Sequence, residues 1–318
     1  MMRIKRPTCT LATLGEDLMK GGCLSAQALL KAAFVFLSGA LLVALIPIVA
    51  HANPGDLYAT DNSSIRIYAP DGSGSIFASG LLRPRGLAFD GFGNLFVATL
   101  DTATLSDDRG MVLKFAPDGT VTVFATGLDS PSGLAFDGAG NLYVTSSRVF
   151  PGGGRVTKIT PGGVKSLFAI LGPDPKPFHQ NFGIAIDERN NLFVADNQQD
   201  KIYMITPDIR FGTAGEISTF VSLPVPIGLA FDGAGNLYAS DGGPDVGEPG
   251  SITKIAPDGT ETLVVSGLGG LRGLAFDPNG NLFAAGHDNN VIYKITPGGS
   301  VNIFANGLNV PQYLAVEP

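Results

Sequence analysis

The chain has 318 residues and a formal net charge of -7, and 15% of its residues are charged. Its 43 glycines and 22 prolines are too many for a mostly helical protein, and a hydrophobic content of 44% excludes a disordered chain. The excess of acidic residues argues against nucleic acid as a partner, because a phosphate backbone requires clustered Lys and Arg.

The first 52 residues have the pattern of an export signal. Lys31 precedes an apolar run over residues 32–50, which ends in the small-residue sequence A-H-A. A positive flank, an apolar stretch and an A-x-A end predict a signal peptide over residues 1–52, and with it a secreted or periplasmic protein. The run is also long enough to span a bilayer, so an uncleaved membrane anchor is the alternative. Cys9 and Cys23 both lie within this segment, so no disulfide or cysteine metal site is expected downstream.

Residues 53–318 repeat one pattern and are expected to form a single domain. The phrase GLAFDGFGNLFVA begins at Gly86 and recurs with small changes. The later copies begin at Gly133, Gly183, Gly228 and Gly273. Starts that lie about 45 residues apart, each followed by further short apolar runs, are typical of the blades of a β-propeller.

Each part of the repeat predicts a strand or a turn. The phrase that starts at Gly86 predicts an inner strand, whose Gly and Ala fit a crowded position. Asp90 and Asn94 bracket the turn to the second strand, where their side chains bond the local backbone and glycine accepts a positive φ. The runs that start at Val112 and Val123 predict the third and fourth strands. Because each Asp–Gly turn supplies one carboxylate, these motifs are expected to be turns and not calcium loops.

The two ends of the chain determine the number of blades. Residues 57–78 supply a second, a third and a fourth strand but no first strand. Residues 313–316 have the pattern of a first strand with nothing after it. Pairing of the two segments completes one blade and covers edges that an open array would expose. The sequence therefore predicts an all-β fold, a six-bladed β-propeller of four-stranded blades closed by its C-terminal strand.

The repeat resembles a known family of propellers. Its pattern is clearest in FGIAID, from Phe182, and in NLFVADN, from Asn191, and there it resembles the NHL repeat. It is also similar to the SMP-30/gluconolactonase superfamily of six-bladed propellers. The resemblance covers nearly all of residues 53–318 and implies the fold, whereas propellers host many activities. Streptogramin lyases are less similar, because their second-strand motif contains Trp and Glu and this chain has no Trp.

The resemblance to lactonases implies a divalent cation held by Glu, Asn and Asp at the ends of the innermost strands. The residues at these positions are Arg85, Ser132, Phe182, Ile227, Arg272 and Gln312. None is a carboxylate, and the two arginines would repel a cation, so direct transfer of the lactonase site is not supported. The nearest match is Asn181, one residue before these positions.

Long loops are expected on one face of the disc, which we call the long-loop face. By the strand order that the resemblance implies, this face carries the connections that precede each first strand and those between second and third strands. The longest are 101–109, 146–154, 173–181 and 241–250. Long loops on one rim of a rigid scaffold are the usual place for binding and catalysis. We expect a small molecule or a protein to bind there; the alternative is that the loops are insertions without a role.

Individual residues on this face supply the candidate site. The ligand-binding candidates are Arg85, Asn181, Asp196, Asp241, Arg272 and Gln312. The two arginines come from blades separated by one other, and a guanidinium pair suits a carboxylate or a phosphate. The alternative is that they pair with Asp61, Asp101 or Asp241 on the same rim. The metal candidates, for calcium or zinc, are His179, His287 and Asp288. The alternative is that these histidines are ordinary loop residues.

The sequence thus predicts an exported, monomeric binding module of NHL type, without assigned catalytic residues. Repeats close to consensus and the missing lactonase carboxylates favour binding over catalysis. The alternative is a divergent lactonase-like hydrolase or lyase with a divalent metal in the central channel. A membrane partner is expected only if the N-terminal segment stays uncleaved.

Overall fold

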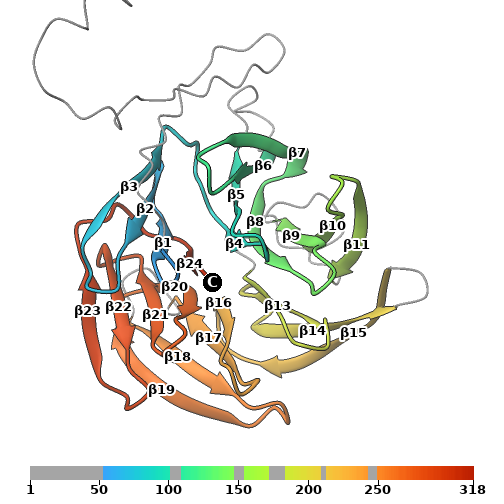
Figure 1. Cartoon of the computed structure of the whole chain (residues 1–318). Coiled ribbons are helices and arrows are strands. Elements are labelled where there is room, and N and C mark those ends of the chain that lie inside the picture. Colours follow the sequence, from blue (N-terminus) through green and yellow to red (C-terminus); the bar gives the residue numbers. More distant parts are fainter. Residues whose placement is uncertain (1–52, 101–108, 147–153, 172–182, 209–212, 243–248) are drawn as a thin grey trace, which may run out of the picture. The chain divides into compact units, whose positions relative to one another are not determined.

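The computed structural model describes residues 53–100, 109–146, 154–171, 183–208, 213–242 and 249–318. Within these ranges the chain forms 24 β-strands. None of the described residues belongs to a helix long and apolar enough to cross a membrane. The strands form six antiparallel, four-stranded sheets, the blades, which are arranged in a ring (Figure 1). The predicted all-β, six-bladed propeller is confirmed, and residues 1–52 lie outside the described ranges.

Blades 1 to 3 each run from an innermost to an outermost strand. From the inside outward, blade 1 contains β24 (Leu314–Val316), β1 (Leu57–Thr60), β2 (Ser64–Tyr68) and β3 (Gly74–Ser79). Blade 2 contains β4 (Leu87–Phe89), β5 (Leu95–Leu100), β6 (Arg109–Phe115) and β7 (Val121–Asp129). Blade 3 contains β8 (Pro131–Phe136), β9 (Leu142–Ser146), β10 (Gly154–Ile159) and β11 (Lys165–Leu171).

Blades 4 to 6 repeat this order. Blade 4 contains β12 (Ile184–Ile186), β13 (Leu192–Asp196), β14 (Lys201–Asp208) and β15 (Thr213–Ser222). Blade 5 contains β16 (Pro226–Phe231), β17 (Leu237–Asp241), β18 (Gly250–Ile255) and β19 (Glu261–Leu268). Blade 6 contains β20 (Leu271–Phe276), β21 (Leu282–Gly286), β22 (Val291–Ile295) and β23 (Val301–Ala305).

Strand β24 closes the ring as the sequence predicted. It pairs antiparallel with β1, with Leu57 opposite Val316. Just beyond this ladder, the N–H of Thr60 donates to the carbonyl of Tyr313 at 3.0 Å, and the N–H of Gln312 donates to the carbonyl of Thr60 at 2.9 Å. The closing blade therefore has the same four-stranded form as the other five.

The inner strands of neighbouring blades approach each other closely, which explains their glycines. A Cβ atom on Gly86 would lie 2.2 Å from the carbonyl oxygen of Ser132 in the next blade. A Cβ atom on Gly228 would lie 2.1 Å from the carbonyl oxygen of Arg272. Because the two strands are so close, the Gly86 N–H donates to the Ser132 carbonyl at 2.8 Å. The expectation of a crowded inner position is confirmed.

The turn between the first and second strand of a blade is held by an acid and an amide. In blade 2, Asp90 Oδ1 accepts hydrogen bonds from the N–H groups of Phe92 and Asn94, both at 2.9 Å. Asp90 Oδ2 accepts from the Asn94 side-chain amide at 2.7 Å, and Gly93 has a φ of 75°. The carboxylate is thus used by its own turn, as expected of an Asp–Gly turn.

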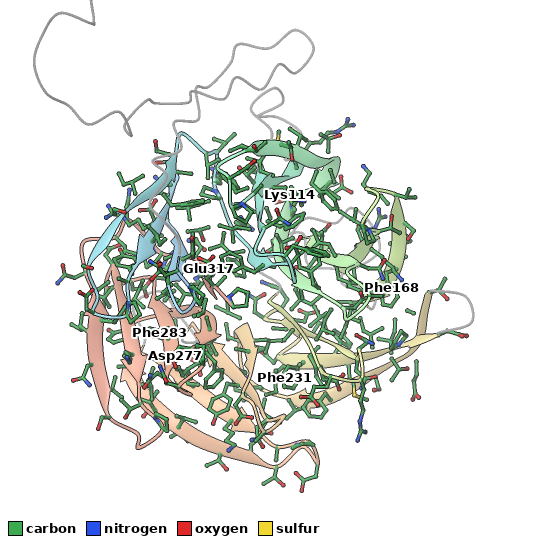
Figure 2. All side chains as sticks on the ribbon, viewed as in Figure 1. Lys114, Phe168, Phe231, Asp277, Phe283 and Glu317 are labelled. Atoms are coloured by element: carbon green, nitrogen blue, oxygen red, sulfur yellow. The ribbon has the colours of Figure 1, made fainter. Side chains whose placement is uncertain are left out.

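Aromatic side chains connect several pairs of neighbouring blades. Phe96, on the second strand of blade 2, has its ring centroid 4.9 Å from Phe124 in the same blade and 4.9 Å from Phe136 in blade 3. The ammonium group of Lys114 lies 5.7 Å from the same ring centroid (Figure 2). Edge-to-face contacts of this kind add to the burial of apolar surface. Each interface between neighbouring blades has a buried hydrophobic cluster of its own.

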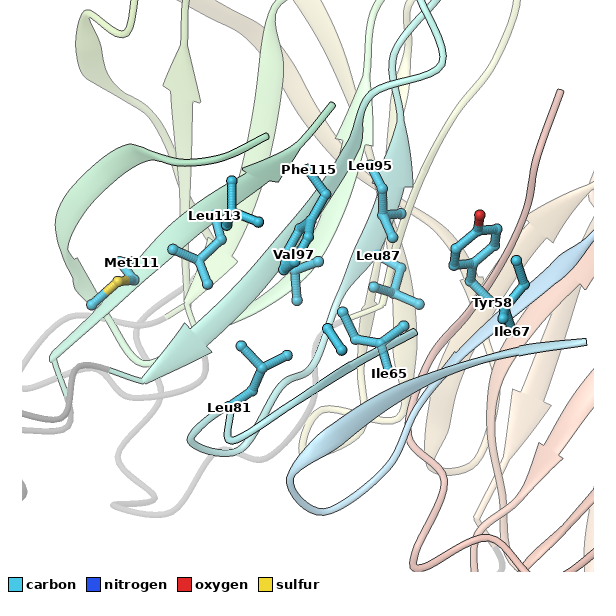
Figure 3. Close-up of a cluster of buried hydrophobic side chains, with 12 residues drawn as sticks. Tyr58, Ile65, Ile67, Leu81, Leu87, Leu95, Val97, Met111, Leu113 and Phe115 are labelled. Carbon is cyan, nitrogen blue, oxygen red and sulfur yellow. The ribbon is translucent and has the colours of Figure 1, made fainter. Parts of the chain in front are cut away.

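The interface between blades 1 and 2 shows this core in detail (Figure 3). Tyr58 and Ile65 of blade 1 belong to one buried cluster with Leu87, Val97 and Phe115 of blade 2. Burial of this apolar cluster joins the closing blade to its neighbour.

Candidate functional site

Four side chains from the innermost strands make up what we call the axial cluster: Arg85, Ser132, Arg272 and Tyr313. Arg85 lies just before β4, Arg272 lies on β20, and Tyr313 lies just before β24. Blade 1 stands between blades 6 and 2 around the ring, so Tyr313 comes from the blade between the two arginines (Figure 1). Ser132, on β8, comes from blade 3.

Tyr313 occupies the position that is glycine in the other five copies of the repeat. Its hydroxyl lies 2.8 Å from Ser132 Oγ, so the side chain reaches from blade 1 to blade 3. Burial raises the pKa of Tyr313, while the hydrogen bond to Ser132 and the charges of both arginines act in the opposite direction. Tyr313 was not among the predicted site residues, although PQYLAV in place of PxGLAF marks it in the sequence.

Arg272 is a largely enclosed cation. Burial lowers the pKa of its guanidinium, the charges of Tyr313 and Asp288 raise it, and the charge of Arg85 lowers it. A guanidinium nevertheless keeps its proton in proteins. Within the described part of the chain, Arg272 forms no salt bridge. The axial cluster is therefore a positively charged site at the N-terminal ends of the inner strands.

The acids that were the alternative partners of the arginines have other contacts. Asp61 accepts from Arg66 Nε at 3.1 Å and from the Ser64 hydroxyl at 2.6 Å. Asp241 accepts from the backbone N–H of Ser251 at 3.0 Å and from its hydroxyl. Asp101 lies outside the described residues.

His287 and Asp288 lie beside Arg272. Leu271, next to the arginine, pairs with Gly286 at the end of β21, and the N–H of His287 donates to the carbonyl of Gly270 at 2.9 Å. His287 Nδ1 lies 2.7 Å from Asp288 Oδ1. Burial lowers the pKa of His287 and the Arg272 charge lowers it further, while Asp288 raises it. A lowered pKa favours the neutral imidazole, and a neutral ring that donates from Nδ1 to Asp288 keeps Nε2 as a base.

The metal candidates are not brought together as a complete site in the described residues. His287 and Asp288 are adjacent, but no group of three or more His, Cys, Asp or Glu side chains converges in the described ranges. His179 and Asn181 lie outside them. Two ligands are fewer than the three or four protein ligands usual for zinc.

The remaining candidates support their own loops. Asp196 Oδ1 accepts from the N–H groups of Gln198 and Gln199, both at 3.0 Å, and shapes the turn after β13. The Gln312 side chain donates to the carbonyl of Val310 at 3.4 Å. Most of the predicted long loops lie outside the described residues, namely 101–108, 147–153, 172–182 and 243–248.

Comparisons with known proteins support the fold. No family model matches the chain, and no curated protein matches it. Among solved structures, a gluconolactonase from Xanthomonas campestris is 19% identical with a TM-score of 0.59; the match covers 76% of this chain and 86% of that one. Virginiamycin B lyase from Staphylococcus aureus is 14% identical with a TM-score of 0.54, covering 83% and 92%. An auxiliary nutrient binding protein from Bacteroides thetaiotaomicron is 13% identical with a TM-score of 0.61, covering 81% and 68%.

These neighbours have the same propeller architecture and include enzymes and a binding protein. At such low identity the likeness shows the fold and not the activity. The chain is thus a six-bladed propeller with gluconolactonase-like structural neighbours, and the NHL-repeat assignment remains a prediction.

Proposed function

We propose that this protein is a binding module for a small anionic molecule, which it holds at the axial cluster on the long-loop face. One observation carries the proposal: the enclosed guanidinium of Arg272 lies close enough to Arg85 for the two charges to interact, and it has no salt bridge within the described residues. Enclosing a charge is costly unless it is paired. A bound anion would offset that cost.

The chemistry of the cluster favours a carboxylate or a phosphate. Guanidinium groups recognise these planar or multi-oxygen anions through paired N–H donors. The buried Tyr313 hydroxyl, which both arginine charges reach, adds a neutral hydrogen-bonding group. A binding protein with this fold is known among the structural neighbours.

The test is anion-dependent thermal stabilisation. Sodium phosphate and sodium acetate, compared with sodium chloride at equal ionic strength, should raise the melting temperature of the full chain. The double variant Arg85→Ala/Arg272→Ala should lose this rise. The matched control is Arg189→Ala, which removes one exposed positive charge from the β12–β13 turn. An equal rise in the double variant would overturn the proposal.

A second function, hydrolysis or lyase chemistry, is favoured by the His287–Asp288 pair beside Arg272. A neutral histidine oriented by a carboxylate is suited to act as a general base, and a nearby guanidinium to stabilise developing negative charge. Gluconolactonase and virginiamycin B lyase are among the structural neighbours. Acid release from a gluconolactone, with and without calcium or zinc, tests this function. Activity equal in wild type and His287→Ala would exclude His287 as the base.

Export and the monomeric state belong to the same proposal. The pattern of residues 1–52 supports a cleaved signal peptide. N-terminal sequencing of exported protein should give Asn53 as the first residue, whereas a chain that keeps residues 32–50 would support the membrane anchor. Light scattering of the purified protein should give the mass of one chain.

A further inference from the structure

The five turns that join the first and second strands of blades 2 to 6 share one acid–amide contact. In each, the amide of an Asn donates to the Oδ2 atom of an Asp at 2.7 or 2.8 Å. The N–H of the same Asp donates to the carbonyl of the same Asn at 2.9 or 3.0 Å. The pairs are Asp90–Asn94, Asp137–Asn141, Asp187–Asn191, Asp232–Asn236 and Asp277–Asn281.

In the closing blade the same two positions are held by two acids. Glu317 follows β24 (Figure 2), and its N–H donates to the carbonyl of Asp56 at 2.9 Å, as the Asp does to the Asn elsewhere. The Tyr58 hydroxyl donates to Glu317 Oε2 at 3.2 Å, as the Tyr143 hydroxyl donates to Asp137 at 3.2 Å in blade 3. Asp56 therefore occupies the position of the Asn in the other blades, but its side chain has no N–H group to donate.

The exchange leaves negative charge without compensation. Asp56 is 3% exposed, and its Oδ2 accepts from the N–H of Asn53 at 2.9 Å. Its Oδ1 is buried and has no hydrogen-bond partner among the described residues. Neither Asp56 nor Glu317 forms a salt bridge within the described residues. The N–H of Gly55 donates to the carbonyl of Glu317 at 2.9 Å and the N–H of Glu317 donates to the carbonyl of Asp56 at 2.9 Å, which holds the two acids side by side.

Buried carboxylates are normally paired, hydrogen-bonded or bound to a metal. We propose that the seam between β24 and β1 binds a hard divalent cation of the calcium type, with Asp56 Oδ1 and the carboxylate of Glu317 as its side-chain ligands. Calcium prefers oxygen ligands and accepts irregular geometry, and carbonyls and water complete its shell. The cation would bind the carboxylate of Glu317, as the Asn amide binds the Asp carboxylate in blades 2 to 6. With two carboxylates, the affinity is expected on the order of 0.1–1 mM.

The sharpest test is Asp56→Asn, which installs in blade 1 the amide that the other turns already have. Thermal unfolding is measured on metal-free full chain, with calcium chloride or with sodium chloride at equal ionic strength. Wild type should gain several degrees with calcium. Asp56→Asn should melt above wild type without metal and gain nothing from calcium. Glu188→Gln, which removes an exposed acid from the β12–β13 turn, should keep the wild-type response.

A second measurement reports the site directly. Terbium, a calcium substitute, luminesces when a nearby tyrosine is excited, and Tyr58 touches Glu317. Luminescence should appear with wild type and Glu188→Gln, be displaced by calcium, and be lost in Asp56→Asn and in Glu317→Gln. Equal calcium stabilisation of wild type and Asp56→Asn, or no stabilisation and no luminescence in wild type, would overturn the proposal.

Discussion

The hydroxyl of Tyr313 and the Oγ of Ser132 lie 2.8 Å apart, although the residues are 181 positions apart in sequence and belong to blades 1 and 3. Ser132 is completely buried, and its blade does not adjoin blade 1 in the ring. This one contact therefore joins two blades that no strand ladder connects.

Tyr313→Phe should destabilise the protein, because it leaves the buried Ser132 hydroxyl without this partner. We expect a loss of about 1–3 kcal/mol in the free energy of unfolding, measured by urea denaturation. The double variant Tyr313→Phe/Ser132→Ala should lose less unfolding free energy than the sum of the losses in the two single variants. Tyr238→Phe is the control, since its hydroxyl bonds no described residue, and it should change little.

Gly228→Ala should be among the most damaging small substitutions. The new Cβ would lie 2.1 Å from the carbonyl oxygen of Arg272 and 2.8 Å from Ser240 Oγ, so the inner strands of blades 5 and 6 would have to separate. A loss above about 3 kcal/mol is expected. Gly233→Ala, in a turn of the same blade with no atom within 4 Å of the new Cβ, should be nearly neutral. Similar melting temperatures for the two variants would contradict the close approach.

Phe96→Ala should weaken the interface between blades 2 and 3. The ring contacts Phe124 and Phe136, and its loss opens a cavity that costs about 3–5 kcal/mol. Phe92, four residues earlier in the same hairpin, is 87% exposed. Phe92→Ala should therefore leave the urea midpoint nearly unchanged, and a comparable loss in both variants would show that burial does not distinguish them.

Stability should fall in mildly acidic solution because of His287. Its pKa is lowered in the folded protein by burial and by Arg272. The unfolded chain therefore binds a proton at His287 more readily than the folded chain does. The contribution of His287 to the free energy of unfolding is complete above the unfolded pKa of about 6.5, and it decreases as the pH falls from there through the folded pKa. Urea unfolding at a series of pH values should show a shallower decrease for His287→Gln.

The same pKa tests the arrangement of the axial cluster. Arg272→Gln removes the positive charge that disfavours protonation of His287. An NMR titration should then give a higher pKa for His287 than in wild type. An unchanged pKa would mean that the guanidinium charge does not act on this imidazole.

Local sequence patterns were enough to predict the blade. The inner glycines such as Gly86, the turn from Asp90 to Asn94 and the closing strand after Tyr313 follow from patterns that recur with one period. Strands and turns can be predicted from such patterns because strand alternation and turn chemistry depend on neighbouring residues in the chain. The count of six blades followed from the same period and the two incomplete ends.

Which side chains from different strands meet could be learned only from the folded chain. The contacts between Tyr313 and Ser132, between Arg272 and His287, and between Asp56 and Glu317 come from segments separated in the sequence. The repeat could locate Arg85 and Arg272 on one rim, but it could not tell which acids were already used by their own loops. Those contacts depend on the direction in which each side chain extends from its strand and on the neighbours that it meets there, and a pattern with one period carries no information about either.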